Sequence, residues 1–207
     1  MNYGIIKVLT RFYLIFLLCL GAFETVSGKE EPQGEELSSL FPSCPVKFVT
    51  DVLAAKDGSL WVVGEGACVY RLEPESGMRG GHGRWLRMDY FPGFPQMEDF
   101  RCVAQDLKGC IWVGTDNGGV AVFNGKEWKI YDRKNALPGD RVVDIAVSPV
   151  TGEVAVATSG GVAVYDSREG RWDCLNRSNG LYSDQVQSLE FDARGRLWLA
   201  YSCGGVG

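Results

Sequence analysis

Histidine is almost absent from this chain, since His82 is the only one among 207 residues. Zinc sites and Ser–His–Asp triads both depend on histidine side chains. His82 lies in the glycine-rich segment Gly80-Gly81-His82-Gly83, where a loop histidine is usually solvated. That segment follows a turn and opens no helix, so it is not a phosphate-binding or dinucleotide fingerprint. We therefore predict a protein that is not an enzyme, with no catalytic residue, no metal and no cofactor.

Runs of basic residues are also missing, and the formal net charge is −5 at pH 7. Without residues 1–28 the chain keeps 19 basic and 25 acidic residues, a net charge of −6. Nucleic-acid binding depends on the neutralisation of phosphates, and anionic membranes attract polybasic segments. The composition therefore argues against nucleic acid and against an electrostatic membrane contact.

No apolar run reaches the roughly 20 residues that a membrane-spanning helix needs. The longest, Phe12–Phe23, follows Lys7 and Arg11 and precedes the small residues Val26-Ser27-Gly28. This order is typical of a signal peptide, which we predict over residues 1–28, with an uncleaved anchor as the alternative. The mature chain is then periplasmic or secreted and makes no membrane contact after cleavage.

CxxC pairs are absent as well, although six cysteines follow the predicted signal peptide. They are Cys44, Cys68, Cys102, Cys110, Cys174 and Cys203. An even number in an exported chain permits disulfides. Buried thiols are an equally good interpretation, because cysteine is among the most buried residue types.

What the chain does have is an apolar five-residue pattern that recurs with a regular step. Its four copies are Leu60–Gly64, Ile111–Thr115, Val154–Thr158 and Leu197–Tyr201. Their centres, 61, 112, 155 and 198, are separated by steps of 51, 43 and 43 residues, and a glycine precedes each centre by three residues. A period in the low forties built from strand-like segments indicates a β-propeller. An insertion over Glu73–Arg84 explains the longer first step.

We predict an all-β fold: a β-propeller of four-stranded antiparallel blades, incomplete, with about three and a half blades present. A flexible acidic leader covers residues 29–45, and the propeller covers 46–207, with blades at about 46–98, 99–140, 141–184 and 185–207. Trp85, Trp128 and Trp172 occupy equivalent fourth-strand positions and are expected to pack between neighbouring blades. The strands expected for the second and third blades are Phe100–Gln105, Cys110–Thr115, Gly119–Phe123, Glu127–Asp132, Val142–Ser148, Glu153–Thr158, Gly161–Tyr165 and Arg171–Leu175.

The second repeat resembles the two-component regulator propeller repeat. The resemblance rests on Ile111-Trp112-Val113-Gly114-Thr115-Asp116-Asn117-Gly118-Gly119-Val120-Ala121-Val122-Phe123 and on two similar lead-ins, Asn135–Val142 and Gly180–Val186. It implies an extracytoplasmic ligand-sensing propeller like those of bacterial hybrid sensor proteins, often tuned to glycans. The chain departs from that family in having no membrane helix, kinase or regulator domain after the repeats, and fewer blades than the family's tandem rings of seven.

The last repeat stops at Gly207, before its third and fourth strands. Propellers close with 4 to 8 blades, which favours a truncated gene product or a fragment. The alternative is a four-blade ring completed by residues 37–48 and closed by a disulfide between Cys44 and Cys203.

Residues that recur in every repeat are expected to be structural, because each copy meets the same local need. This applies to the turn residues Asp106 and Asp192 and to Trp61, Trp112 and Trp198. Binding is expected in the loops that join the second and third strands and in those that lead to the next blade. The candidate ligand-binding residues there are Glu65, Phe94, Asp116, Asn117, Asn135, Asn179, Tyr182 and Asp184.

Tyr182 and Phe94 are expected to stack on a ligand, and the Asn and Asp side chains to bind its hydroxyl groups. These choices predict an exported, non-enzymatic module that senses or binds a small molecule or glycan. Three alternatives remain: a propeller-type lyase or other enzyme, a scaffold that pairs with other propeller repeats, and a truncated product without an independent function.

Overall fold

The structure is a chain of antiparallel β-sheets, each built from consecutive strands. The computed structural model describes residues 45–46, 48–66, 68–74, 83–96 and 99–202. Among these, three sheets have four strands in sequence order, and a last sheet has two. The strands are β1 Val49–Ala54, β2 Leu60–Gly64, β3 Cys68–Pro74, β4 Gly83–Arg87, β5 Phe100–Gln105, β6 Ile111–Thr115, β7 Val120–Phe123, β8 Trp128–Tyr131, β9 Val142–Val147, β10 Val154–Thr158, β11 Gly161–Asp166, β12 Arg171–Leu175, β13 Val186–Phe191 and β14 Leu197–Tyr201.

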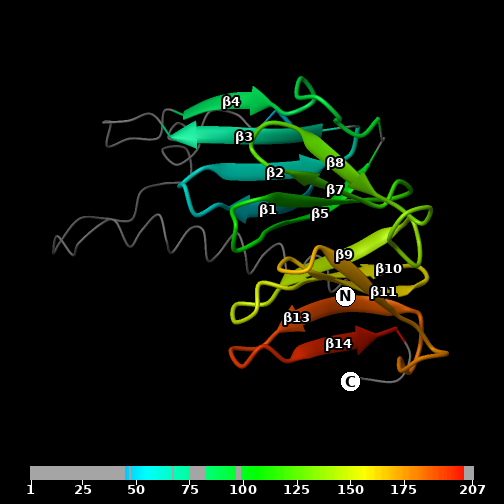
Figure 1. The fold of residues 1–207 in the computed structure, drawn as a ribbon. Coiled ribbons are helices and arrows are strands. Elements are labelled where there is room, and N and C mark those ends of the chain that lie inside the picture. Colours follow the sequence, from blue (N-terminus) through cyan, green and yellow to red (C-terminus); the bar gives the residue numbers. More distant parts are fainter. Residues whose placement is uncertain (1–44, 47, 67, 75–82, 97–98, 203–207) are drawn as a thin grey trace, which may run out of the picture.

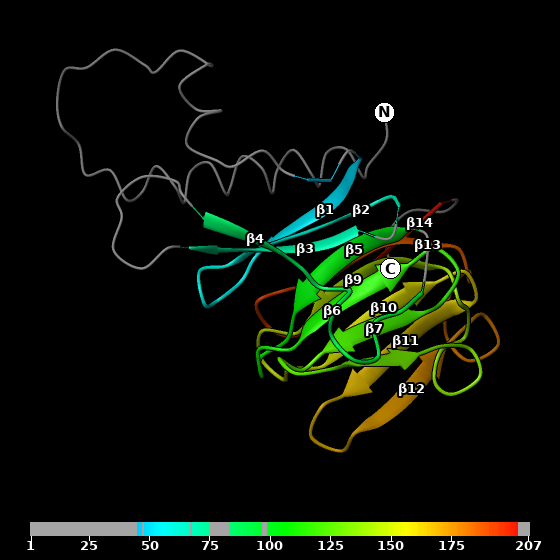
Figure 2. The same ribbon diagram turned by 90° about the horizontal axis from the view of Figure 1, so that it is seen from above.

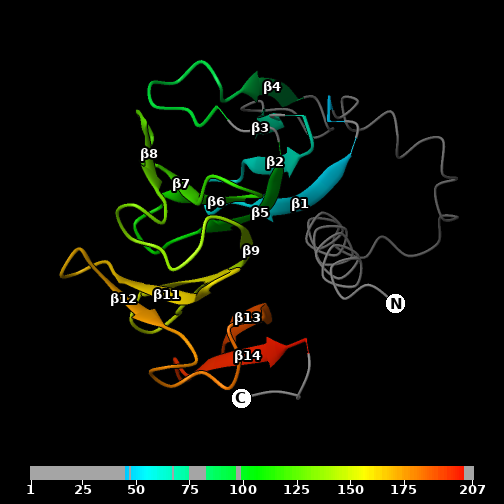
Figure 3. The ribbon, with the colours of Figure 1, turned by 90° about the vertical axis from the view of Figure 1, so that its right-hand side faces the viewer.

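The sheets fan out from their first strands, as the blades of a propeller do (Figure 3). β5 lies beside β1 and β9, and β9 also lies beside β13, so the first strands form the inner edge of the array. The fourth strands lie at the outer edge, and Figure 2 shows β12 at a margin of the array, far from β1. The predicted all-β class and four-stranded blades are confirmed. The third and fourth strands of the last repeat are not among the described residues.

The predicted strand limits hold to within one residue in the second and third sheets. The end residues of the insertion predicted over Glu73–Arg84 belong to strands, because Glu73 pairs with Arg84, and Pro74 with Gly83, across the β3–β4 hairpin. Its ends therefore lengthen two strands, while residues 75–82, including His82, lie outside the described residues. The signal peptide, the leader as far as residue 44, and both Cys44 and Cys203 also lie outside them. Nothing in the described part forms a helix long and apolar enough to cross a membrane.

The turn aspartates fix the first hairpin of a blade, as predicted. Asp106 accepts hydrogen bonds from the backbone N–H groups of Lys108 and Cys110, both at 2.9 Å, and from Nε1 of Trp112 at 3.0 Å. Gly109 completes the turn with φ +89°, a conformation that favours glycine. Asp192 makes the same set of bonds, including one from Nε1 of Trp198 at 3.3 Å. The aspartate therefore holds both the turn and the tryptophan that follows it.

Tryptophan side chains fill the space between successive sheets. Trp112 is 1% exposed, and its ring lies 5.5 Å from that of Tyr165 and 5.9 Å from that of Trp172 in the next sheet. Trp128 packs against Phe94 at 5.6 Å and donates to the carbonyl of Met88 at 3.2 Å. The predicted packing between blades is thus confirmed for two of the three fourth-strand tryptophans.

For Trp85 the described contacts are with its own sheet. It packs on Tyr70 of its own sheet, with ring centroids 6.4 Å apart, and joins a cluster with Val52 and Val62. These residues lie on the face of the first sheet that points away from the second sheet. The described contacts of Trp85 therefore lie within its own sheet.

Two buried aspartates connect the inner strands of neighbouring sheets. Asp51 in β1 accepts hydrogen bonds from its neighbour Val52 and from Val103 of β5, both at 2.9 Å. Asp144 in β9 repeats the arrangement with Ile145 at 2.9 Å and Leu189 of β13 at 2.8 Å. Both lie beside a register shift in the first strand, and each carboxylate accepts from backbone N–H groups of two neighbouring inner strands.

Candidate functional site

The loops expected to carry function lie together at one end of the array, which we call the loop face. In Figure 1 the arrows of β2, β4 and β14 point towards this end, on the right. In each blade a backbone bond joins the loop after the second strand to the residue before the first strand. The bonds run from the N–H to the carbonyl, in the pairs Glu65 to Phe48 (3.1 Å), Asp116 to Asp99 (3.1 Å), Ser159 to Arg141 (2.9 Å) and Ser202 to Gln185 (3.3 Å).

Asn135 and Asn179 hold the lead-in loops in shape. Oδ1 of Asn135 accepts a hydrogen bond from the N–H of Asp132 at 3.0 Å. Asn179 does the same for Asn176 at 2.7 Å and donates from Nδ2 to the carbonyl of Cys174 at 2.9 Å. Because both amides serve one turn geometry 44 residues apart, we assign them a structural role.

Asp184 closes the same loop from its other end. It accepts a hydrogen bond from the N–H of Arg177 at 2.6 Å, and Asp140 accepts one from Arg133 at 2.8 Å in the preceding loop. The pair is again 44 residues apart, so Asp184 belongs with the repeated, structural residues. The likeness of the two lead-ins was already visible in the sequence and could have separated these residues from ligand-binding ones.

Phe94 does not offer a face to a ligand. It is 9% exposed and packs against Phe100 at 5.7 Å and Trp128 at 5.6 Å. Its neighbour Gly93, with φ +77°, brings the loop so close to β8 that a Cβ would lie 2.3 Å from the carbonyl oxygen of Trp128. The expectation of a stacking platform is therefore corrected: the loop folds inward and its aromatic ring enters the core.

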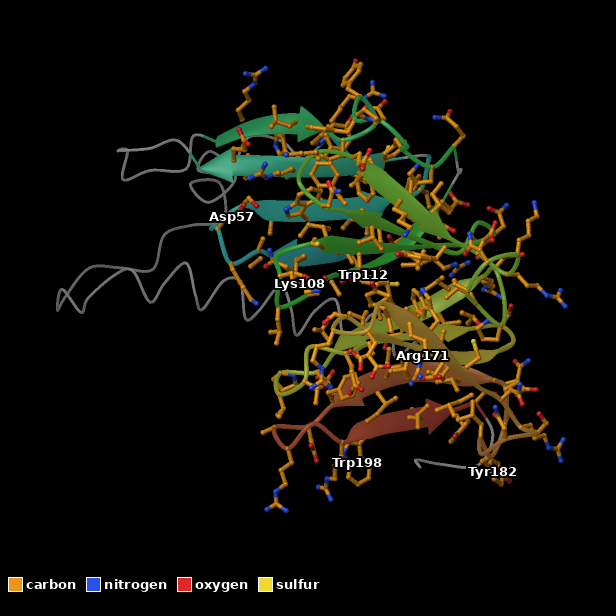
Figure 4. All side chains as sticks on the ribbon, in the orientation of Figure 1. Asp57, Lys108, Trp112, Arg171, Tyr182 and Trp198 are labelled. Carbon is orange, nitrogen blue, oxygen red and sulfur yellow. The ribbon has the colours of Figure 1, made fainter. Side chains whose placement is uncertain are left out.

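Tyr182, Glu65 and Asn117 remain exposed on the loop face. Tyr182 is 69% exposed and meets the ring of Tyr201 edge-on, with centroids 5.7 Å apart. Figure 4 shows it at the end of the array opposite Asp57 and Lys108. The three residues remain predicted ligand contacts, and the structure leaves each of them accessible.

Asp116 lies in a rigid loop between β6 and β7. Thr115 donates from Oγ1 to the carbonyl of Gly119 at 2.8 Å and accepts from the N–H of Gly118 at 2.8 Å. Gly119 has φ +76° and donates to the carbonyl of Asp140 at 2.7 Å. A Cβ at Gly119 would lie 2.1 Å from the carbonyl oxygen of Tyr131. These contacts fix the position from which Asp116 projects.

Two arginines converge on Asp116, and neither was predicted as a site residue. Nε of Arg101 in β5 and Nε of Arg141, just before β9, both approach the same carboxylate oxygen, Oδ1. The hydrogen bond from Arg101 is the main cause that lowers the pKa of Asp116 from its usual value, and Arg141 adds to the effect. The carboxylate is therefore ionised at neutral pH, and the three side chains carry a net charge of +1.

A sequence signal for these arginines did exist. The residues before the four first strands are Phe48, Asp99, Arg141 and Gln185, which differ in charge from blade to blade. Where equivalent positions of the repeats carry different residue types, a structural role shared by all blades does not explain them. Among the described residues, no group of three His, Cys, Asp or Glu side chains could hold a metal ion.

Comparison with known proteins establishes the fold of the chain. No protein-family model and no curated protein matches it. Among solved structures, it is similar to the extracellular domain of the putative hybrid two-component system BT3049 from B. thetaiotaomicron, with a TM-score of 0.63, 20% identity, and coverage of 85% of this chain and 24% of that chain. The extracellular domain of the putative one-component system BT4673 from the same organism gives a TM-score of 0.59 at 17% identity, with coverage of 82% of this chain and 24% of that chain.

The Dos1 propeller is also similar, with a TM-score of 0.57, 12% identity, and coverage of 77% of this chain and 44% of that chain. The fold is therefore a β-propeller, and the predicted architecture is confirmed. The chain spans about a quarter of the length of the two sensor domains.

Proposed function

We propose that this chain is part of an exported, non-enzymatic propeller that binds a small molecule or glycan at its loop face. One observation carries the proposal: unrepeated polar side chains gather there, with Arg101 and Arg141 both in contact with Asp116 and with Asn117 exposed next to Asp116. Residues that serve only the blades recur, whereas these do not. The extracellular sensor domains among its structural neighbours support a periplasmic or secreted location and a sensing role.

On a glycan array, the full chain should give saturable binding to a subset of saccharides. Tyr182→Ala should weaken that binding about threefold to tenfold, because an exposed ring contributes about 0.5–1.5 kcal/mol through stacking. Val150→Ala is the matched control, since Val150 is 59% exposed but lies in the turn between β9 and β10, at the opposite end of the array. A folded chain that retains no saccharide on the array would count against the proposal.

A second candidate function is pairing with another propeller blade, and Trp198 favours it. Trp198 donates to its turn aspartate as Trp112 does, yet it is 44% exposed, whereas Trp61 and Trp112 are 3% and 1% exposed under the next sheet. Figure 4 shows Trp198 on the outer side of β14, away from the other sheets. The partner that fits this face is a blade whose aromatic side chains cover the ring, as Tyr165 and Trp172 cover Trp112.

If a second copy of the chain supplies that blade, light scattering should give a mass above the 22.7 kDa of one chain. Trp198→Glu should return the mass to that of a monomer, because a carboxylate on this face would be buried without a partner. Tyr90→Glu is the control, since Tyr90 is 79% exposed and lies between β4 and β5. Wild-type chain that is monomeric and folded over the whole concentration range would contradict pairing between copies.

A further inference from the structure

The two arginines on Asp116 leave most of their hydrogen-bonding capacity open. Each approaches Oδ1 through Nε, which is one of the three nitrogens of its guanidinium. Within the described residues, Asp116 is the only acidic group at ion-pair distance from either arginine. A guanidinium has five N–H donors, and its planar fork matches the two oxygens of a carboxylate. One aspartate oxygen therefore does not satisfy this pair.

The cluster is accessible from solvent and yet held in place. The side chains of Arg101, Asp116 and Arg141 are 39%, 37% and 57% exposed. Arg101 belongs to β5, and the carbonyl of Arg141 accepts the hydrogen bond from Ser159. Their positions are thus set by two neighbouring inner strands and one rigid loop. Preorganised donors lower the entropy lost when an anion binds.

Hydroxyl-binding groups continue along the loop face from the arginines towards the last sheet. Ser159 adjoins Arg141 through its backbone bond, and Gln185 and Gln187 are exposed on the next lead-in and inner strand. Amides and hydroxyls both donate to and accept from sugar hydroxyl groups. The ring of Tyr182 lies on the same face and offers a stacking surface.

We propose that Arg101 and Arg141 bind the carboxylate of an acidic saccharide, with Asp116 as a positioning residue that holds the two guanidiniums together. The saccharide part of this inference rests on the proposed function, whereas the anion part rests on the geometry of the arginines. Asp116 and its partners keep a net charge of +1, so an incoming carboxylate brings the cluster to neutrality. Charge-assisted bonds to arginine forks are roughly twice as strong as bonds between neutral groups.

An ion pair that only connects blades two and three is the competing explanation. Such exposed pairs typically contribute about 0.2–1 kcal/mol to stability and bind nothing. The two explanations differ in what Arg141→Gln changes. An ion pair that only connects the blades predicts a slightly lower melting temperature. A binding site predicts lost affinity for acidic ligands. Ligand binding is therefore the measurement that separates them.

The test is calorimetric titration of the full chain at low ionic strength with three probes: digalacturonate, its methyl ester and sodium sulfate. Digalacturonate should bind about tenfold more tightly than the ester, which has the same hydroxyl groups but no charge, because one charge-assisted contact is lost. Arg141→Gln should weaken digalacturonate binding by about tenfold, and Arg101→Gln should do the same. Arg133→Gln removes the same charge from the same lead-in loop without touching Asp116, and should leave binding unchanged.

Equal affinity for digalacturonate and its ester, or unchanged affinity in both arginine variants, would overturn the inference while leaving saccharide binding itself in place. Sulfate that binds as tightly as digalacturonate would overturn the saccharide part. Binding of none of the three probes would overturn the inference as a whole. The glycan array tests the proposed function separately, so the two failures are distinguishable.

Discussion

A Trp112→Ala variant should lose about 4 kcal/mol of unfolding free energy, because removal of a fully buried tryptophan leaves a cavity that the surrounding sheets cannot fill. Trp112 is 1% exposed and contacts the rings of Tyr131, Tyr165 and Trp172, which belong to two sheets. The change also removes the Nε1 donor to Asp106, a residue that is 4% exposed. Both losses act at the interface between the second and third sheets.

Urea denaturation followed by circular dichroism measures this loss, and Trp198→Ala is the matched control. Trp198 occupies the same position in its repeat and donates to the equivalent Asp192, but it is 44% exposed. We expect it to lose about 1 kcal/mol, because much of its ring is already in water. Equal losses in the two variants would mean that burial between blades is not what makes Trp112 stabilising.

The strands were predictable because the repeats have similar turn and strand residues at equivalent positions. The glycine and the apolar second strand recur in all four repeats, and the turn aspartate recurs in two of them, as Asp106 and Asp192. The third repeat has Ala155 where the others have tryptophan, and its strand β10 still pairs at the expected positions. The pattern of strand and turn residues therefore specifies the blade, and the tryptophan specifies only how the gap to the next blade is filled.

The candidate site was less predictable, because loop position does not fix side-chain direction. Phe94 and Tyr182 were chosen on the same grounds, as aromatic residues in loops that lead to the next blade. Phe94 turns inward because Gly93 lets its loop approach β8, whereas Tyr182 stays in solvent. The sequence also did not show the side-chain hydrogen bonds of Asn135 and Asn179. Their spacing of 44 residues, which is close to the repeat period, nevertheless indicated a shared structural role.

The arginine pair was missed because its members come from different sequence contexts. Arg101 lies inside a strand, and Arg141 lies directly before one. Only the arrangement of the inner strands brings both to Asp116. Charge differences between equivalent positions of successive repeats are the pattern that would have found them.

Asp144→Ala should lower the unfolding free energy by about 3 kcal/mol, the cost of leaving two buried N–H groups without an acceptor. Asp144 is 7% exposed, and its carboxylate accepts from Ile145 and Leu189, which are 3% and 1% exposed. Neither N–H group can turn to water without opening the interface between β9 and β13. The loss should therefore appear as lower protection of the Leu189 amide in hydrogen exchange, and not only as a lower melting temperature.

Ser188→Ala tests the side-chain bond to Asp144 separately from the two backbone bonds to the same carboxylate. Ser188 donates from Oγ to the same carboxylate at 2.8 Å, so its removal takes away this side-chain donor and keeps both backbone bonds to Asp144. We expect a loss of about 1 kcal/mol, with the Leu189 amide still protected. A loss from Asp144→Ala as small as that from Ser188→Ala would show that the backbone bonds across the blades contribute little. In that case apolar packing alone would hold the last sheet to the array.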